Sequence, residues 1–160
     1  MTDIHYLTFQ VGSQQFCIPA EMVVDINRNC DCTSVPGAPE SIKGILNLRG
    51  QLIVAFDMAT TLGIDAELNT LNPVSIIVDV DSSRISLLVD RVGDILPLNE
   101  STFESPPSNF PTHIRQAVLG AHKLHTALLI VLDPYLFIKD LISNSNPGNT
   151  SVSDLLTLSQ

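Results

Sequence analysis

The stretch that decides the fold reads SIKGILNLRGQLIVAFD, from Ser41 to Asp57. Two apolar runs, Ile42–Leu48 and Leu52–Phe56, flank the polar residues Arg49-Gly50-Gln51. Glycine adopts a positive φ angle without steric cost, and a tight turn between two strands requires such an angle. The pattern therefore predicts a β-hairpin that turns at Gly50.

Two polar side chains, Asn47 and Arg49, lie beside this predicted turn. The planar guanidinium of Arg49 can hold carboxylate or carbonyl groups of a partner bidentately. An internal bridge from Arg49 to a structural carboxylate such as Asp57 or Asp25 is an equally open alternative, and both roles are compatible. For Asn47 we favour an amide that stabilises the turn. The stretch resembles neither a catalytic dyad nor a phosphate loop and is typical of a surface that a partner binds.

The composition indicates a globular protein whose partners are other proteins. The chain has 160 residues, of which 44% are hydrophobic, enough for one domain or two small ones with a real core. Eight basic and seventeen acidic residues give a net charge of −9. This balance disfavours non-specific nucleic-acid binding, which depends on Lys and Arg to neutralise phosphates, and it disfavours an anionic membrane surface.

The sequence predicts a cytoplasmic protein with reduced thiols. Residues Met1–Gln10 show no secretory signal pattern. The apolar runs are far shorter than the roughly 20 residues that a membrane helix needs, so we expect no membrane insertion. The three cysteines, Cys17, Cys30 and Cys32, are an odd number, and two of them are only one residue apart. Such spacing disfavours a disulfide framework.

Short apolar runs separated by turn signals predict a mostly β chain with few helices. Residues Met22–Ile26 fit either a strand or a short helix that leads into one. Loops are expected at Asn29–Pro39 and at Asn99–Thr112. The helices expected are Met58–Leu62, capped by Asp57, and Pro134–Ile142. The strands expected are Tyr6–Val11, Phe16–Ile18, Ile42–Leu48, Leu52–Phe56, Val74–Val80, Ile85–Val89, Ile95–Leu98, Val118–Ala121 and Ala127–Leu132.

A weak internal repeat indicates two similar halves, and the polar connector Asp65–Pro73 is the best candidate for the boundary between them. Residues 16–26 align with residues 85–95, and Leu52–Asp57 aligns with Leu128–Asp133. Duplicated small β-barrels are therefore the expected fold. The polar tail 143–160 is expected to be flexible, although the pattern Val152–Leu158 fits one helical turn.

Four blocks of sequence then carry a resemblance to a known family. The pattern PxxIKGIxNLRG from Pro39 to Gly50, followed by Ile53 and Asp57, resembles the CheW-like domain of bacterial chemotaxis. The resemblance extends over about Tyr6–Leu141. It includes the second-half block Ile85–Leu96 and the late residues Leu119-Gly120 and Leu128–Asp133. A single CheW-like domain over residues 1–142, made of two barrel halves, is expected.

The resemblance implies a scaffold without a reaction, cofactor or metal of its own. It implies two small, five-stranded, SH3-like barrels around a shared core. Its implied partners are the cytoplasmic tip of a chemoreceptor and the regulatory domain of a histidine kinase, itself CheW-like. The receptor-contacting positions of the family map to Val23, Asp25, Asn47 and Arg49, whereas no sharp motif marks the kinase contact. Asp25 stands where Glu is common in the family, which bears on which receptor is recognised.

Two alternative functions stay open at this level. The chain could serve a non-swimming chemosensory pathway, such as pilus motility or gene regulation. It could also be a small thiol enzyme that uses Cys30 or Cys32 with His113, His122 or His125. A zinc site is disfavoured because it needs about four ligands and the chain has no second close cysteine pair.

Overall fold

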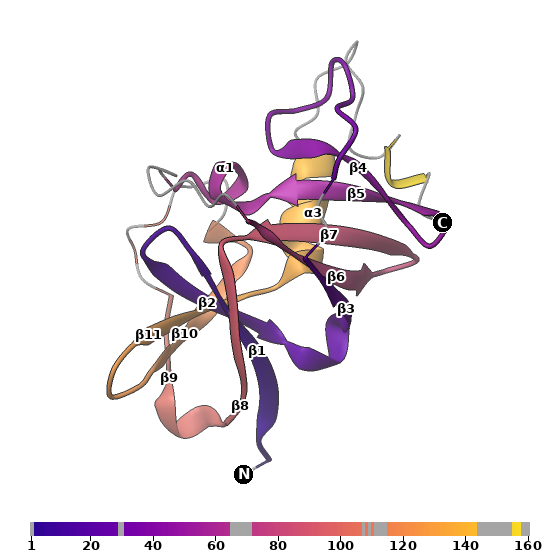
Figure 1. Ribbon diagram of the computed structural model, residues 1–160. Helices are drawn as coiled ribbons and strands as arrows, with labels where there is room; N and C mark the ends of the chain where they lie inside the picture. The colour runs from indigo at the N-terminus through magenta and orange to yellow at the C-terminus, as the bar shows by residue number, and fades with distance from the viewer. Residues whose placement is uncertain are drawn as a thin grey trace.

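The computed structural model describes residues 2–28, 31–64, 72–106, 108, 110, 115–143 and 155–157. Strands dominate this part of the chain (Figure 1). The helical segments are η1 (Ala20–Met22), α1 (Met58–Leu62), η2 (Glu100–Thr102) and α3 (Pro134–Ser143). The strands are β1 (Ile4–Val11), β2 (Gln14–Pro19), β3 (Val23–Asn27), β4 (Ile42–Leu48), β5 (Gln51–Asp57), β6 (Val74–Val80), β7 (Ser83–Val89), β8 (Arg91–Leu98), β9 (Phe103–Glu104), β10 (Val118–Lys123) and β11 (Leu128–Leu132).

The strands form two sheets, which confirms the predicted mostly β fold. Sheet A has the order β8-β1-β2-β11-β10-β9, and sheet B has the order β3-β6-β7-β5-β4. Sheet A exceeds the expected five strands because the two-residue strand β9 adds to its edge. Neighbouring strands are antiparallel except for β2 with β11 and β5 with β7. Each sheet therefore has one parallel pair of strands at its centre, and the two sheets share the same strand arrangement.

The internal repeat seen in the sequence is a structural repeat, but its strands are exchanged between the sheets. Strands β1 and β2 precede the connector at residues 65–73 and join β8, β9, β10 and β11, which follow it, in sheet A. Strands β6 and β7 follow the connector and join β3, β4 and β5 in sheet B. The two barrels are therefore not the two halves of the sequence. Each barrel is completed by a hairpin from the other repeat.

One hydrophobic core lies between the two sheets and draws on both. It includes Phe9 and Phe16 of sheet A, Phe56 of sheet B and Phe137 of α3, all of them at most 2% exposed. The rings of Phe56 and Phe137 pack edge to face with centroids 6.0 Å apart. Burial of each such ring stabilises the fold by about 1.5–3 kcal/mol. The two sheets share this core and cannot separate without exposing it.

Each sheet also has a smaller apolar cluster on its other face. In sheet B this cluster contains Leu46, Ile53 and Ile77. In sheet A it contains Tyr6, Cys17, Leu129 and Val131. Central strands are therefore buried on both faces, which explains why runs such as Ile53–Phe56 show no alternation of apolar and polar residues.

In each sheet, a glycine lets another extended segment of the chain approach the strand closely. In β4, a β-carbon on Gly44 would lie 2.4 Å from the carbonyl oxygen of Thr33, which forms an isolated bridge with Ile45. In β10, a β-carbon on Gly120 would lie 2.3 Å from the ring of Phe103 in β9. The strand pairing shifts register at both glycines. Both edges are thus partly covered, which limits unwanted strand pairing.

Three segments resolve expectations that the sequence left open. Residues Met22–Ile26 divide between the last residue of η1 and strand β3. The expected long loop at Asn99–Thr112 contains η2 and β9 among its described residues. Most of the tail 143–160 lies outside the described residues, but Leu155 and Leu156 are helical and buried in the shared core. These two leucines pack on the domain.

Candidate functional site

The site begins with the turn between β4 and β5. Leu48 pairs with Gln51, and the two residues between them have positive φ angles, 53° for Arg49 and 84° for Gly50. This is the two-residue hairpin turn in which both central residues are left-handed, and it confirms the predicted hairpin. A positive φ is uncommon outside glycine. The amide N–H of Gly50 donates to Oδ1 of Asn47 at 3.0 Å, so Asn47 stabilises the turn.

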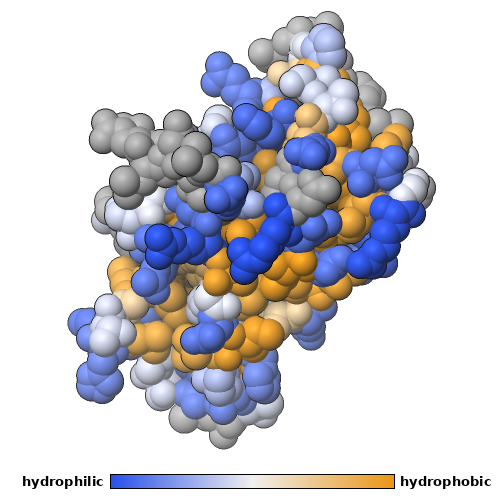
Figure 2. Space-filling model, viewed as in Figure 1, coloured by the Kyte–Doolittle hydropathy of each residue, from blue (hydrophilic) through white to orange (hydrophobic). Residues whose placement is uncertain are grey.

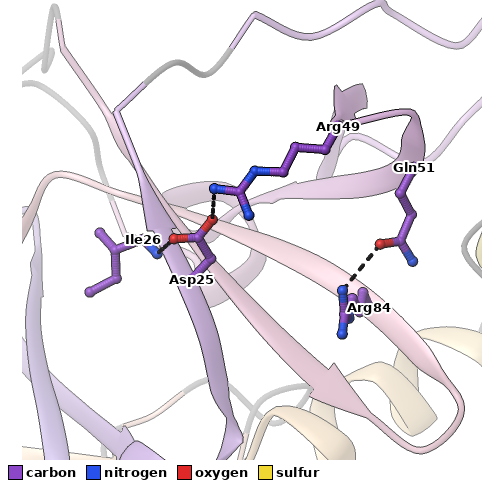
Figure 3. A network of polar contacts seen from close by, with 5 residues as sticks. All are labelled: Asp25, Ile26, Arg49, Gln51 and Arg84. Atoms are coloured by element: carbon purple, nitrogen blue, oxygen red, sulfur yellow. Dashed lines mark hydrogen bonds and ion pairs between the residues drawn. The ribbon is translucent and has the colours of Figure 1, made fainter.

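Arg49 reaches from this turn across the open side of sheet B to strand β3. Its Nη2 atom lies 3.5 Å from Oδ2 of Asp25 (Figure 3). The amide N–H of Ile26 donates to the other carboxylate oxygen of Asp25 at 2.8 Å. Strands β3 and β4 are the two edges of sheet B, so this ion pair links strands that no ladder joins.

The exposure of the two partners distinguishes their roles. The side chain of Arg49 is 82% exposed, whereas that of Asp25 is 29% exposed. An ion pair that is so accessible contributes at most about 1 kcal/mol to stability, because water and salt screen it. Asp25 therefore orients the guanidinium more than the pair strengthens the fold. Most of the guanidinium surface faces solvent, where a partner can reach it.

Arg84 makes a second polar contact with the same turn, from the β6–β7 hairpin. Arg84 of β7 donates from Nη1 to Oε1 of Gln51 at 3.3 Å and from Nε to Oδ1 of Asp79 at 3.0 Å. Figure 3 shows Gln51 and Arg84 on the side of the turn away from Asp25. The turn that carries Arg49 is thus tied both to β3 and to the β6–β7 hairpin.

The other residue expected at this site, Val23, packs inward. It is half-buried against the shared core, and the register of β3 with β6 shifts between Val23 and Asp25. The apolar side chains that β3 exposes are Val24 and Ile26, each 42% exposed. In the view of Figure 2, hydrophobic residues form a band across the middle of this face, bordered by hydrophilic side chains. The sequence had suggested Ile26, beside Asp25 and Val23, as part of a contact edge, but it did not single out Val24.

A groove of about 600 Å³ lies beside Asn47 and was not predicted. The segment around Thr33 forms one wall, because its N–H and C=O groups exchange hydrogen bonds of 2.9 Å with Ile45 of β4. The turn-rich composition of Asn29–Pro39 indicated only a loop. The groove combines apolar and polar side chains: Asn27, Asp31, Thr33, Val35, Ile45, Leu46, Asn47, Leu48 and Leu52.

The residues of the thiol-enzyme alternative are not brought together where the structure describes them. Cys32 packs against the small cluster of sheet B, whereas His122 is buried in sheet A and His125 is exposed. Burial raises the pKa of Cys17 to about 12, so its thiol stays protonated. Cys30 and His113 lie outside the described residues.

Within the described ranges, His, Cys, Asp and Glu side chains form no group of three or more that could hold a metal ion. Among the helices that the structure describes, none is long and apolar enough to cross a membrane.

Comparison with known proteins identifies the family. The sequence matches the family model of the CheW-like domain over residues 5–141. The chain belongs to the CheW-like family. Among its relatives, the chemotaxis protein CheW of Rhizobium meliloti (strain 1021) is 34% identical over 117 residues, which cover 71% of this chain and 76% of the relative. The probable chemotaxis protein CheW of Rhizobium etli is 28% identical and covers 82% of this chain and 84% of its own.

A solved structure of the CheW-like family supports the same fold. The scaffolding protein TtCheW from Thermoanaerobacter tengcongensis superimposes with a TM-score of 0.78 over 94% of this chain and 98% of its own, at 24% identity. At this identity the likeness bears on the fold alone. The family match and the relatives together indicate that this chain has an adaptor role in chemotaxis-type signalling.

Proposed function

We propose that this CheW-like chain is a non-enzymatic, cytoplasmic scaffold that couples the cytoplasmic tip of a chemoreceptor to the regulatory domain of a histidine kinase. The proposal treats residues 1–142 as one domain. The observation that carries it is the Asp25–Arg49 pair, which holds an exposed guanidinium beside a groove at the open side of sheet B.

On this proposal Arg49 binds the receptor directly. Asp25 occupies one edge of the guanidinium, and the remaining N–H donors face solvent. A guanidinium held in this way can donate hydrogen bonds to a carboxylate or carbonyl group of a partner, and binding costs less conformational entropy because the ion pair already restricts the side chain. The internal bridge and the partner contact, which the sequence left as alternatives, then operate together.

The groove and the exposed apolar residues of β3 would supply the rest of the receptor contact. Val24 and Ile26 flank Asp25 in β3 and present their side chains on the other face of this edge strand, and Leu52, which lines the groove, is 40% exposed. Helical partners dock through apolar side chains that enter such grooves, while polar groups at the rim fix their register. We infer that Asn47, which lines the groove, contributes at this rim.

We infer that the kinase binds sheet A, so that the receptor site on sheet B remains accessible. Ile4 of β1 is 50% exposed and Ile95 of β8 is 55% exposed. Both strands lie at the end of sheet A, away from the β4–β5 turn in Figure 1. By the register of β1 with β8 these two side chains lie on opposite faces of the sheet, so we infer that the edge strand β8, which carries Ile95, contacts a second β-barrel domain, the kind of domain expected in the kinase.

The fold supports a rigid link between these two faces. Each sheet holds strands from both sequence repeats, and both sheets share one core. A change of receptor conformation can therefore shift the kinase equilibrium through a scaffold of fixed geometry. Individually weak contacts suffice where many copies are held together, because the effective concentration is high.

A reconstitution with partners from the same organism tests the proposal. The purified chain is mixed with its candidate kinase and receptor fragments, and co-sedimentation and kinase autophosphorylation are measured. We expect a ternary complex and receptor-dependent kinase activity. A chain that binds neither partner would contradict the proposal. Pull-down from a lysate of its own organism then identifies whether the receptors belong to swimming or to another chemosensory pathway.

A further inference from the structure

The interior of sheet A contains a buried histidine that the adaptor role does not use. His122 of β10 is 2% exposed, and it is flanked by the rings of Tyr6 and Phe103, each with its centroid 5.3 Å from that of His122. Its Nδ1 atom shares a hydrogen bond of 2.9 Å with the hydroxyl of Thr102 in η2. Its Nε2 atom is buried and has no hydrogen-bond partner among the described residues.

The repeat shows that a histidine is not needed here for packing. Gly44 of β4 corresponds to Gly120 of β10, and two residues further on Leu46 corresponds to His122. Leu46 pairs with Ile53 inside sheet B just as His122 pairs with Leu129 inside sheet A. An aliphatic side chain therefore fills the equivalent position without leaving an unpaired polar atom.

His122 contacts both elements at one edge of sheet A. Strand β9 has only two residues, and it pairs with β10 at Ala121 and His122. Together, the Thr102 hydrogen bond and the contact with Phe103 attach η2 and β9 to this histidine. In Figure 1 these two elements follow β8 along the chain, and β9 forms the edge of sheet A at the opposite end of the strand order from β8. Phe103 and the backbone of Glu104 also lie close to Gly120, so this two-residue edge strand rests on a small part of β10.

We propose that His122 is a pH-sensitive latch that closes the η2–β9 edge of sheet A while it is neutral and releases it on protonation. An imidazolium needs two hydrogen-bond acceptors, and the closed arrangement offers at most the one hydroxyl of Thr102. An unpaired buried charge is costly, so the charged ring gains by moving to solvent. Opening of η2 and β9 exposes it with the least loss of core.

Among the residues that the structure describes, no buried carboxylate compensates a charge on His122. Its buried ionisable neighbours in the cluster of sheet A are Tyr6 and Cys17, and burial raises the pKa of both, which keeps them neutral. Burial lowers the pKa of His122 itself. The charged groups on the surrounding elements are exposed: His5, Arg91, Asp94, Glu100, Glu104 and Lys123.

The sign of the effect follows from linkage. In the open state the imidazole of His122 has the ordinary histidine pKa of about 6.5, whereas in the closed state burial lowers its pKa. The open state therefore binds more protons as the pH falls through about 6.5, and opening becomes more favourable. Above this pH both states are neutral and the latch contributes its full stability. Between about pH 7.5 and about pH 5.5 the opening equilibrium rises by up to roughly tenfold.

Two measurements on the purified chain test this latch without any partner. An NMR titration of the histidine rings should place protonation of His122 below the ordinary range. Hydrogen exchange, expressed as protection factors, should show up to roughly tenfold lower protection of β9 and of Ala121 near pH 5.5 than near pH 7.5. Amides of the β6–β7 ladder in sheet B should keep their protection and serve as the internal control.

Matched variants separate the latch from general acid effects. His122→Leu, which copies the equivalent residue of sheet B, should remove the pH dependence at β9, whereas His125→Gln at an exposed position should leave it unchanged. Protection of β9 that is independent of pH in the natural chain, or equal loss in His122→Leu, would overturn the proposal. A pKa of His122 within the ordinary histidine range would also overturn the proposal. This measurement is made on the natural chain and does not depend on whether a variant folds.

Discussion

The guanidinium of Arg49 and the carboxylate of Asp25 join two strands that are neighbours in space but lie at opposite ends of the strand order of sheet B. Residues 24 positions apart meet because the sheet curls until β3 approaches the turn after β4. The hairpin turn, the left-handed conformation of Arg49 and the hydrogen bond from Gly50 to Asn47 together aim the arginine at β3. The exposed ion pair is therefore positioned by the whole barrel.

Replacement of Gly50 tests the geometry of the turn. Gly50→Val should destabilise the fold by about 1–2 kcal/mol, because a branched side chain is strained at a φ of 84°. A β-carbon at this position meets no atom within 4 Å, so the loss reflects backbone conformation and not a clash. Thermal denaturation measures it. Gly50→Asn is the control and should lose little, since asparagine tolerates the left-handed region; an unchanged midpoint for Gly50→Val would argue against this turn.

Replacement of Gly44 tests the close approach of the segment around Thr33 to β4. Gly44→Ala should cost about 1–3 kcal/mol, because the new methyl group would lie 2.4 Å from a backbone oxygen that no side-chain rotation can move. Urea denaturation gives the change in the free energy of unfolding. Equal stability of Gly44→Ala and the natural chain would show that this segment does not rest on β4.

Two leucines near the end of the chain test whether the tail stabilises the domain. Leu155 and Leu156 are 4% and 7% exposed in the shared core, so alanine at either position should cost about 2–5 kcal/mol. Leu128→Ala is the matched control: this leucine is 39% exposed and its loss should cost much less. Similar melting temperatures for all three variants would mean that the two tail leucines do not pack on the core in solution.

Much of the fold could be predicted because the local signals agree with the final structure. The glycine turn after Arg49, the helix at Met58–Leu62 and the helix that begins at Pro134 all form as expected. The exchange of hairpins between the barrels could not be predicted. Strands buried on both faces show no periodicity, so their sequences do not reveal which neighbours they pair with.

The candidate site was only partly predictable for a related reason. Asp25 was one of two internal acids considered for Arg49, and the curl of sheet B selects it over Asp57, whose carboxylate instead accepts from the hydroxyl of Thr60 at 3.0 Å. The groove was missed because polar residues around Thr33 give no signal for the strand they lie against. Contacts between distant segments depend on the tertiary fold, which local propensity does not encode.

The most direct test of the adaptor proposal is receptor-dependent kinase activity measured with Arg49→Ala. Loss of a charge-assisted contact should weaken receptor coupling by about tenfold or more, whereas the melting temperature changes little because the ion pair is exposed. Lys43→Ala removes an exposed, equally charged side chain of β4 in the same sheet and should keep coupling. Full kinase activation by Arg49→Ala would contradict the assignment of this arginine to the receptor contact.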